Sequence, residues 1–181
     1  MTPQKIIMAK YPDNAHDAEG MAVHPNGDLF ILTKEYSARS ELAFPAQLYR
    51  LSAEQIAQAN GEVEEMEHLG ELDLPQLLSG YGRGGQLVTG MDISADGKRA
   101  LIITYQTALE LLFEPIGGIF TAGGQSADEK IWDIPIEILP QMEAIAYASD
   151  QKSFYYDTEY NEGFGSAPIH QVACLNFRSA P

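Results

Sequence analysis

The sequence predicts an all-β protein built from repeated four-stranded antiparallel sheets. One pattern, an apolar run followed by a turn and a second apolar run, occurs three times, at residues 17–35, 88–106 and 142–159. Each turn contains residues that tolerate the positive φ angles of tight hairpins. These turns are Asn26-Gly27, Asp96-Gly97 and Asp150-Gln151. Stacking such small sheets buries faces that one sheet cannot bury alone, so we expect about three blades of the β-propeller type.

The three copies also correspond position by position. Met21, Met91 and Ile145 occupy one position, Val23, Ile93 and Tyr147 a second, and Thr33, Thr104 and Thr158 a third. The first of these positions recurs after 70 residues (91 − 21) and then after 54 residues (145 − 91), an irregular spacing in the range of propeller blades. The alternative is three unrelated hairpins in an ordinary β-sandwich. The constant order of strand, turn and strand favours blades.

The first predicted blade spans residues 17–74. After its hairpin come a third strand at residues 47–51 and a helical turn that begins at Ser52, with Gln55 completing a capping box and Asn60-Gly61 as the stop. Residues 64–74 supply the fourth strand. The preceding short run, residues 5–9, then has no place in this blade and is expected to complete another one.

Two further blades follow a glycine-containing linker at residues 75–87. Residues 82–85 of this linker, Gly-Arg-Gly-Gly, do not fit a phosphate cradle, because a strand and not a helix is expected after them. The second blade spans residues 87–139 and has an edge strand at 131–139. The third spans residues 142–177 and lacks a fourth strand. The whole chain, residues 1–181, is one domain by length.

Charge and composition exclude several classes of function. The chain has 26 acidic and 11 basic residues, a net charge of −15, which disfavours binding to nucleic acid or to anionic membrane surfaces. No apolar run approaches the roughly 20 residues of a membrane helix. The N-terminus lacks the apolar core of a signal peptide, so we expect a cytoplasmic protein, or a periplasmic or secreted one if a leader has been removed. Cys174 is the single cysteine and excludes an internal disulfide.

Several short elements resemble a family of bacterial β-propellers described as phytase-like or esterase-like, with WD40- or NHL-like repeats. They are Asp17-Ala18-Glu19-Gly20, Glu143-Ala144, Thr33-Lys34-Glu35, Asp157-Thr158-Glu159 and the run at residues 88–97. The resemblance covers residues 4–176, roughly half the length of such a propeller. It implies the propeller fold and, for function, a Ca²⁺-assisted hydrolase of phosphate or ester bonds.

Carboxylates precede two of the three inner strands. Asp17 and Glu19 come before the first and Glu143 before the third, while Thr89 replaces the acid in the second. In a propeller these positions converge on one rim near the axis. The carboxylates then have three open roles: bracing blade junctions through backbone N–H groups, binding Ca²⁺ through oxygen ligands, or acting as an acid/base pair. His16, Asp157 and Glu159 are further candidate ligand-binding residues.

We expect a ligand- or partner-binding module, because no catalytic constellation is complete. The spacing of His and Cys predicts no zinc site, and no Gly-x-Ser-x-Gly elbow occurs. The alternative is the Ca²⁺-assisted hydrolase, with Asp17, Glu19 and Glu143 as metal ligands. Three blades form an arc with two open apolar faces, so we also expect a homodimer. In it, residues 5–9 of each chain complete the partner's third blade, giving a six-bladed ring by strand exchange.

Overall fold

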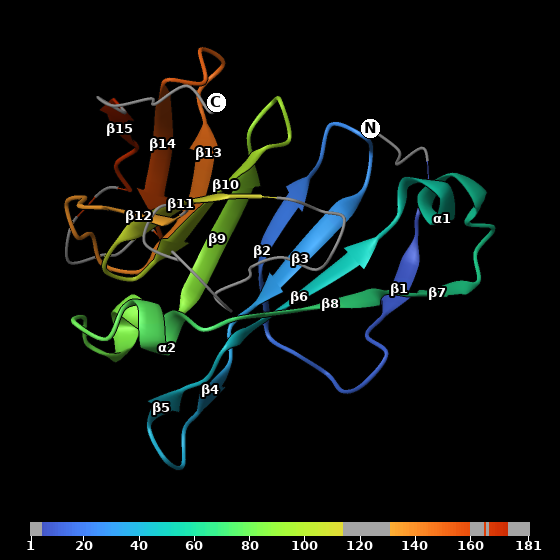
Figure 1. The fold of residues 1–181 in the computed structure, drawn as a ribbon, viewed down its shortest axis with the longest axis horizontal. Helices are drawn as coiled ribbons and strands as arrows, with labels where there is room; N and C mark the ends of the chain where they lie inside the picture. Colours follow the sequence, from blue (N-terminus) through green and yellow to red (C-terminus); the bar gives the residue numbers. More distant parts are fainter. Residues whose placement is uncertain (1–4, 114–130, 160–164, 166, 174–181) are drawn as a thin grey trace.

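The computed structural model describes residues 5–113, 131–159, 165 and 167–173, and it is mostly β, with small antiparallel sheets and a few short helices (Figure 1). The first sheet has the strand order β2-β3-β6-β8 and the second β9-β10-β11-β12; the third, within the described residues, has the order β13-β14-β15. In each sheet the strands follow one another in chain order as an antiparallel meander. The predicted all-β class and the three hairpins are therefore confirmed.

The strand bounds are close to those expected from the sequence. The first sheet contains β2 (Ala18–Val23), β3 (Leu29–Thr33), β6 (Ala46–Leu51) and β8 (Glu67–Leu72). The second contains β9 (Val88–Ile93), β10 (Arg99–Thr104), β11 (Ala108–Leu112) and β12 (Ile131–Ile134). The third contains β13 (Met142–Tyr147), β14 (Ser153–Thr158) and β15 (His170–Ala173). The last part of the predicted third blade, residues 174–177, lies outside the described residues.

The three hairpin turns adopt the backbone conformation that their residues predict. Gly27, Gly97 and Gln151 have φ angles of 94°, 73° and 56°, all in the left-handed region. Asp150 carries the third turn without a glycine, because its carboxylate accepts hydrogen bonds from the backbone N–H groups of Lys152 (2.8 Å) and Ser153 (3.1 Å). Each turn therefore fixes the register of its hairpin.

Each of these hairpins also carries a β-bulge at the same place, near the beginning of its first strand. The register shifts between Ala18 and Gly20, at Thr89 opposite the Ile103–Thr104 step, and between Met142 and Ile145. A bulge inserts one unpaired residue, bends its strand and re-aims a side chain. The repeated bulge was not expected from the sequence, and it falls at the positions where the sequence analysis aligned Glu19, Thr89 and Glu143.

The first strands of the three sheets lie side by side, in the order β2, β9, β13, and two apolar cores fill the spaces between the sheets (Figure 1). Side chains of β10 alternate between these cores: Ala100 and Ile102 face the first sheet, and Leu101 and Ile103 face the third. The strands approach closely at Gly20, where an added Cβ would lie 2.9 Å from the Cβ of Met91. Glycine at this position therefore sets the distance between the first two sheets.

The helices are short. Helix α1 (Ala53–Gln58) begins at the predicted capping box, in which Ser52 accepts from the N–H of Gln55. Helix α2 (Leu74–Leu77) and a 3-10 helix (Arg83–Gln86) occupy the segment that was predicted to be an irregular linker. The signal for α2 was present in the sequence, because Asp73 accepts from the N–H of Gln76 (3.0 Å) as an N-cap and Pro75 fits the first turn.

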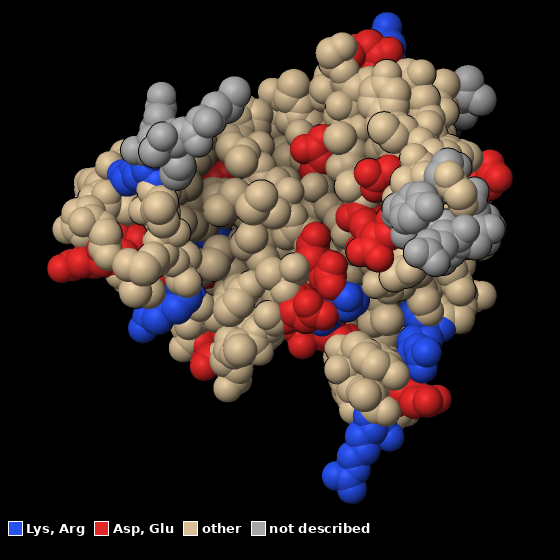
Figure 2. Space-filling view, turned by 180° about the vertical axis from the view of Figure 1, so that it is seen from behind, with Lys and Arg blue, Asp and Glu red and all other residues tan. Residues whose placement is uncertain are grey.

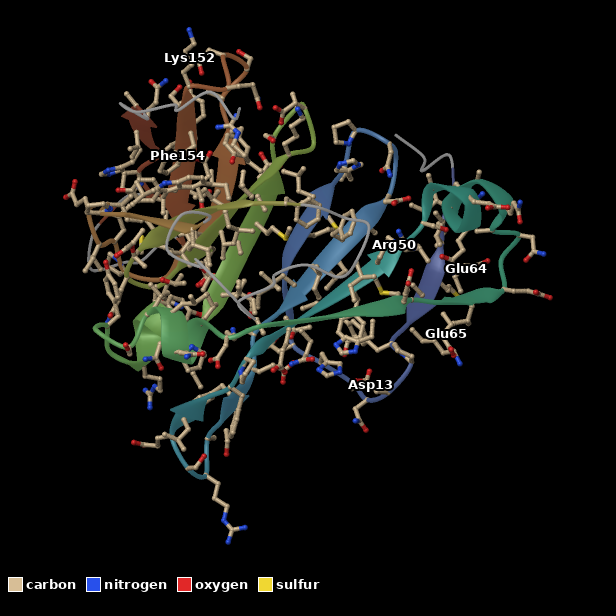
Figure 3. The ribbon with its side chains drawn as sticks, viewed as in Figure 1. Asp13, Arg50, Glu64, Glu65, Lys152 and Phe154 are labelled. Atoms are coloured by element: carbon tan, nitrogen blue, oxygen red, sulfur yellow. The ribbon has the colours of Figure 1, made fainter. Side chains whose placement is uncertain are left out.

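The N-terminal strand differs from its prediction. As expected, it has no place in the first sheet, but β1 (Met8–Lys10) pairs in parallel with β7 (Val63–Glu65) of the same chain in a separate two-stranded sheet. An ion pair of 2.8 Å between Lys10 and Glu65 supports this pairing, and Figure 3 shows Glu64 and Glu65 on β7 next to β1. Within one chain, residues 8–10 therefore have a strand partner without exchange, and the exchange of residues 5–9 with a second chain stays a prediction. A small hairpin, β4 (Tyr36–Ser37) with β5 (Leu42–Ala43), lies between β3 and β6 in the chain.

The close approach at Gly20 gives the first testable prediction. Gly20→Ala places a methyl group against Met91 and Leu32, at 2.9 and 3.2 Å from their Cβ atoms, and should lower the free energy of unfolding by about 1–3 kcal/mol. Urea unfolding followed by circular dichroism measures this change. Gly80→Ala is the matched control, because an added Cβ there meets nothing within 4 Å and should change stability by less than about 0.5 kcal/mol. Equal effects of both substitutions would contradict the proposed role of Gly20.

Candidate functional site

The candidate site lies where β2 and β13 begin and β3 and β10 end. The bulges place Glu19 and Glu143 at these strand starts, and each carboxylate is part-buried. Thr89, at the bulge of the second sheet, is buried, and its hydroxyl donates to the carbonyl of Ile103 (3.4 Å). Figure 2 shows acidic side chains gathered around a basic group on the face turned away from the viewer in Figure 1. The predicted convergence of the strand-start positions therefore brings Glu19 and Glu143 into one neighbourhood.

Lys34, which follows β3, is the basic group of this site. Its ammonium forms a short ion pair with Glu19 and a second one, of 3.3 Å, with Asp17. The hairpin register explains the contact, because Ala18 pairs with Thr33 and the N–H of Lys34 donates to the carbonyl of Asp17 (2.8 Å). Burial lowers the pKa of Lys34, but the hydrogen bond to Glu19 and the nearby negative charges outweigh burial and raise it. Lys34 therefore stays charged.

Tyr105 and three more carboxylates complete this group. Nζ of Lys34 lies 5.9 Å from the centre of the Tyr105 ring. Burial and the charge of Glu143 raise the pKa of the Tyr105 hydroxyl. Burial also raises the pKa of Glu143, as do the charges of Glu19, Glu159 and Asp157. We call these residues the rim cluster: Asp17, Glu19, Lys34, Tyr105, Glu143, Asp157 and Glu159.

The rim cluster does not fit a calcium site. Asp17 and Glu19, two of the three predicted ligands, bind the ammonium of Lys34. Across the described residues, no group of three or more His, Cys, Asp or Glu side chains is arranged to hold a metal ion. Calcium takes six to eight oxygen ligands, so an ammonium between the two carboxylates occupies the place where such a shell would form.

His16 belongs to a second, separate network. Its Nδ1 lies 2.7 Å from Oε1 of Glu35, and its Nε2 lies 2.8 Å from the hydroxyl of Tyr49 and 3.2 Å from Oδ1 of Asp13. The hydroxyl of Tyr49 donates to Asp13 (2.9 Å), which Figure 3 shows on the loop between β1 and β2. The ring of Tyr11 packs against His16 and Tyr49. This network fastens the N-terminal segment to the outer part of the first sheet.

Hydrogen bonds control the ionisation of this network. Burial lowers the pKa of His16, but its contacts with Glu35 and Asp13 outweigh burial, so the pKa is raised. For Asp13, partial desolvation raises the pKa, while the N–H of Asn14 and the side chains of Tyr49 and His16 lower it to about 2. The protonated imidazole and ionised Asp13 therefore stabilise one another, which favours a bracing role for His16 over the predicted ligand-binding role.

Sequence reasoning found the carboxylates and missed their partners. Lys34 appeared in the sequence analysis as part of a motif only, although the Asn26-Gly27 hairpin, once its register is followed, places it across from Asp17. Tyr105 had no signal, because its place depends on how the second sheet packs. Asp157 and Glu159 do lie near Glu143, as their charge effects on its pKa show.

Comparisons with known proteins add little. No family model matches the sequence, and no curated protein matches it. Among solved structures, a chain described as Kuenenia stuttgartiensis hydrazine synthase is similar to 96% of this chain at 12% identity, with a TM-score of 0.39. This chain spans 49% of that chain. A likeness of this size assigns neither family nor function. No described helix is long and apolar enough to cross a membrane.

The ion pairs of Lys34 give a prediction about stability. Lys34→Met leaves Glu19 and Asp17 without their cation and should cost about 1–3 kcal/mol of unfolding free energy at neutral pH. Urea unfolding at neutral pH measures it. Lys152→Met, on the exposed turn labelled in Figure 3, is the matched control and should change stability by less than about 0.5 kcal/mol.

The raised pKa of His16 gives a pH dependence with a defined sign. A group whose pKa is higher in the folded state stabilises fully below its unfolded pKa, about 6.5 for His, and loses this contribution as the pH rises through the folded pKa. The contribution of His16 should therefore decline above about pH 6.5, at most by about 1.4 kcal/mol per pH unit. Denaturant unfolding from pH 5 to 9 should show this decline in the unsubstituted protein and in His68→Gln, and its loss in His16→Gln. Equal slopes in all three would contradict the network.

Proposed function

We propose that the three sheets are blades of a β-propeller-type domain, roughly half of a propeller, and that this domain is a binding module. The support is the threefold recurrence of strand order, turn conformation and bulge position, together with the neighbouring first strands. In such an arrangement the strand starts lie at one end of the axis. The rim cluster, at those starts, is then the natural ligand site of the module.

The ligand that suits the rim cluster is an organic cation, such as a polyamine or a basic peptide. The cluster holds five carboxylates and one ammonium, a formal charge of 1 − 5 = −4. The observation that carries the proposal is the burial of Glu143 next to several other carboxylates. Burial and the charges of Glu19, Glu159 and Asp157 raise the pKa of this part-buried carboxylate, and the charge of Lys34 offsets them only in part. A ligand ammonium that pairs with Glu143 relieves this repulsion.

The alternative from the sequence analysis, Ca²⁺-assisted hydrolysis, has no specific observation in its favour among the described residues. Lys34 already neutralises part of the charge that would attract a divalent ion. Binding of an organic cation needs no vacated carboxylate pair, because Lys34 keeps Asp17 and Glu19. Glu143, Asp157 and Glu159 are left for the ligand, and Glu159 also accepts one hydrogen bond from the side chain of Gln141 (3.1 Å).

Isothermal titration with spermidine at low ionic strength tests this proposal. The unsubstituted protein should bind spermidine, and the variant Glu143→Gln/Asp157→Asn/Glu159→Gln should bind at least about tenfold more weakly, equivalent to about 1.4 kcal/mol. The control variant Glu54→Gln/Glu62→Gln/Glu71→Gln removes the same charge from exposed positions outside the cluster and should bind almost as the unsubstituted protein does.

Equal weakening in both variants would show that spermidine responds to net charge, and absence of binding would overturn the cation site. A parallel thermal-unfolding series with CaCl₂ and with chelator addresses the hydrolase. A ligand that binds the folded state alone raises the melting temperature, so an increase at millimolar Ca²⁺ that chelator reverses would favour the hydrolase over the proposed module.

A further inference from the structure

The two outer faces of the three-sheet stack carry exposed apolar side chains. On the first sheet, Met21 and Val23 of β2 point away from the second sheet and are 64% and 62% exposed. We call these two residues the leading face. On the third sheet, Ala144, Ala146 and Tyr155 point away from the second sheet and are exposed; we call them the trailing face. Exposed apolar groups of this kind, gathered on one sheet face, are typical of interfaces.

Inside the chain, the residues that correspond to the leading face are buried against a neighbouring sheet. Met91 corresponds to Met21 and packs on the first sheet, where it is 4% exposed. Ile145 occupies the same position in the third sheet and packs on the second sheet, where it is 6% exposed. At this position of the repeat, Met91 and Ile145 each pack against a neighbouring sheet, whereas Met21 is exposed. In the structure no sheet packs on Met21 as the first sheet packs on Met91 and the second on Ile145.

The trailing face shows the complementary pattern. Gly20 lies against Met91, and Gly90, its counterpart in β9, lies against the start of β13, where an added Cβ would be 3.3 Å from the Cα of Ala144. Ala144 is the third member of this series and is exposed. Small residues at this position admit the neighbouring strand. The trailing face is thus shaped to receive a strand with the side chains of β2, and the leading face supplies that strand.

We propose that the leading face of one molecule packs on the trailing face of a second copy, and that two such contacts close a symmetric two-chain ring of six sheets. Each contact repeats an interface that the chain already uses twice, between β2 and β9 and between β9 and β13. A head-to-tail contact ends in a ring when its rotation closes, and two copies leave neither face open. The occupant is a second copy because this chain itself carries both complementary faces.

The proposed contact involves no exchange of the N-terminal strand. Tyr11, Ile7 and Ile56 already cover Tyr49 and Leu51 on the outer part of the first sheet. They leave open the inner strand β2, and inner strands are the part through which the sheets of one chain meet (Figure 1). The proposal also stands apart from the cation site, since it uses sheet-face residues outside the rim cluster.

Closure has an electrostatic consequence. It places two rim clusters of the same sign around one axis and brings together two chains of net charge −15. Repulsion between them is screened by salt, whereas apolar packing is not weakened by it. Association should therefore strengthen as ionic strength rises, the opposite of an interface held by ion pairs.

Size-exclusion chromatography with light scattering, at about 50 μM protein in about 0.05 M and 0.5 M NaCl, tests the proposal. We expect a dimer of twice the 19.9 kDa chain mass, more fully populated at the higher salt concentration. Met21→Glu/Val23→Glu, which changes the leading face alone, and Ala146→Glu/Tyr155→Glu, which changes the trailing face alone, should each weaken association at least about tenfold. Because all four positions are exposed, circular dichroism should show folded monomers.

Leu42→Glu is the control, since Leu42 is an equally exposed apolar residue (58%) on the separate β4–β5 hairpin, and it should leave the dimer intact. A stable monomer at both salt concentrations would overturn the proposal and would leave the two faces for another partner or for further sheets of a longer chain. A dimer that survives either face variant would place the interface elsewhere. A dimer disrupted by one face variant alone would indicate that this face packs on the same face of the second copy, and it would equally overturn the proposed contact between leading and trailing faces.

Discussion

A β-bulge followed by a small residue, repeated at the start of three sheets, is the constraint on which the rest of this structure depends. The bulge sets one extra residue out of the ladder, at Glu19, Thr89 and near Glu143. The next residue in the first two sheets, Gly20 or Gly90, carries no side chain, so the neighbouring first strand can approach. Sheets packed at this distance bury the alternating side chains of β10 on both faces at once. The bulge with its following residue thus determines both the packing of the sheets and the position of the rim cluster.

The electrostatics of the site follow from the same bulges. Strand starts that converge bring carboxylates together, and the folded chain must offset their repulsion. Lys34 does so for Asp17 and Glu19, at a position that the hairpin register fixes. Among the described residues Glu143 has no ion pair of this kind, because the third hairpin has Glu159 where the first has Lys34. The charge of Lys34 lowers the pKa of Glu143 but does not outweigh burial and the acidic neighbours, which raise it. The two ends of the rim cluster therefore differ: one is internally neutralised, and the other keeps a negative charge that an external cation can bind.

Local patterns made most of the fold predictable, and contacts between distant segments account for what was missed. Asn26-Gly27, Asp96-Gly97 and Asp150-Gln151 identified all three hairpins, and Ser52 with Gln55 identified the first helix. The parallel pairing of β1 with β7 had no such signal, because parallel strands are joined by long connections that leave no turn to recognise. The same holds for the site: carboxylates stand out in a sequence, whereas Tyr105 reaches them only through sheet packing.

Residues of the site and residues of the proposed interface lie next to one another on β2. Glu19 sits in the bulge, Gly20 faces the second sheet, and Met21 faces away from it. If two copies close through Met21, their rim clusters share one axis, and a cation bound there offsets repulsion that opposes closure. Thermodynamic linkage then requires reciprocity: a ligand that favours the closed pair must itself bind the closed pair more tightly than the open chain. In the proposed assembly, the three successive residues Glu19, Gly20 and Met21 would therefore couple cation binding to association of the two chains without any conformational change.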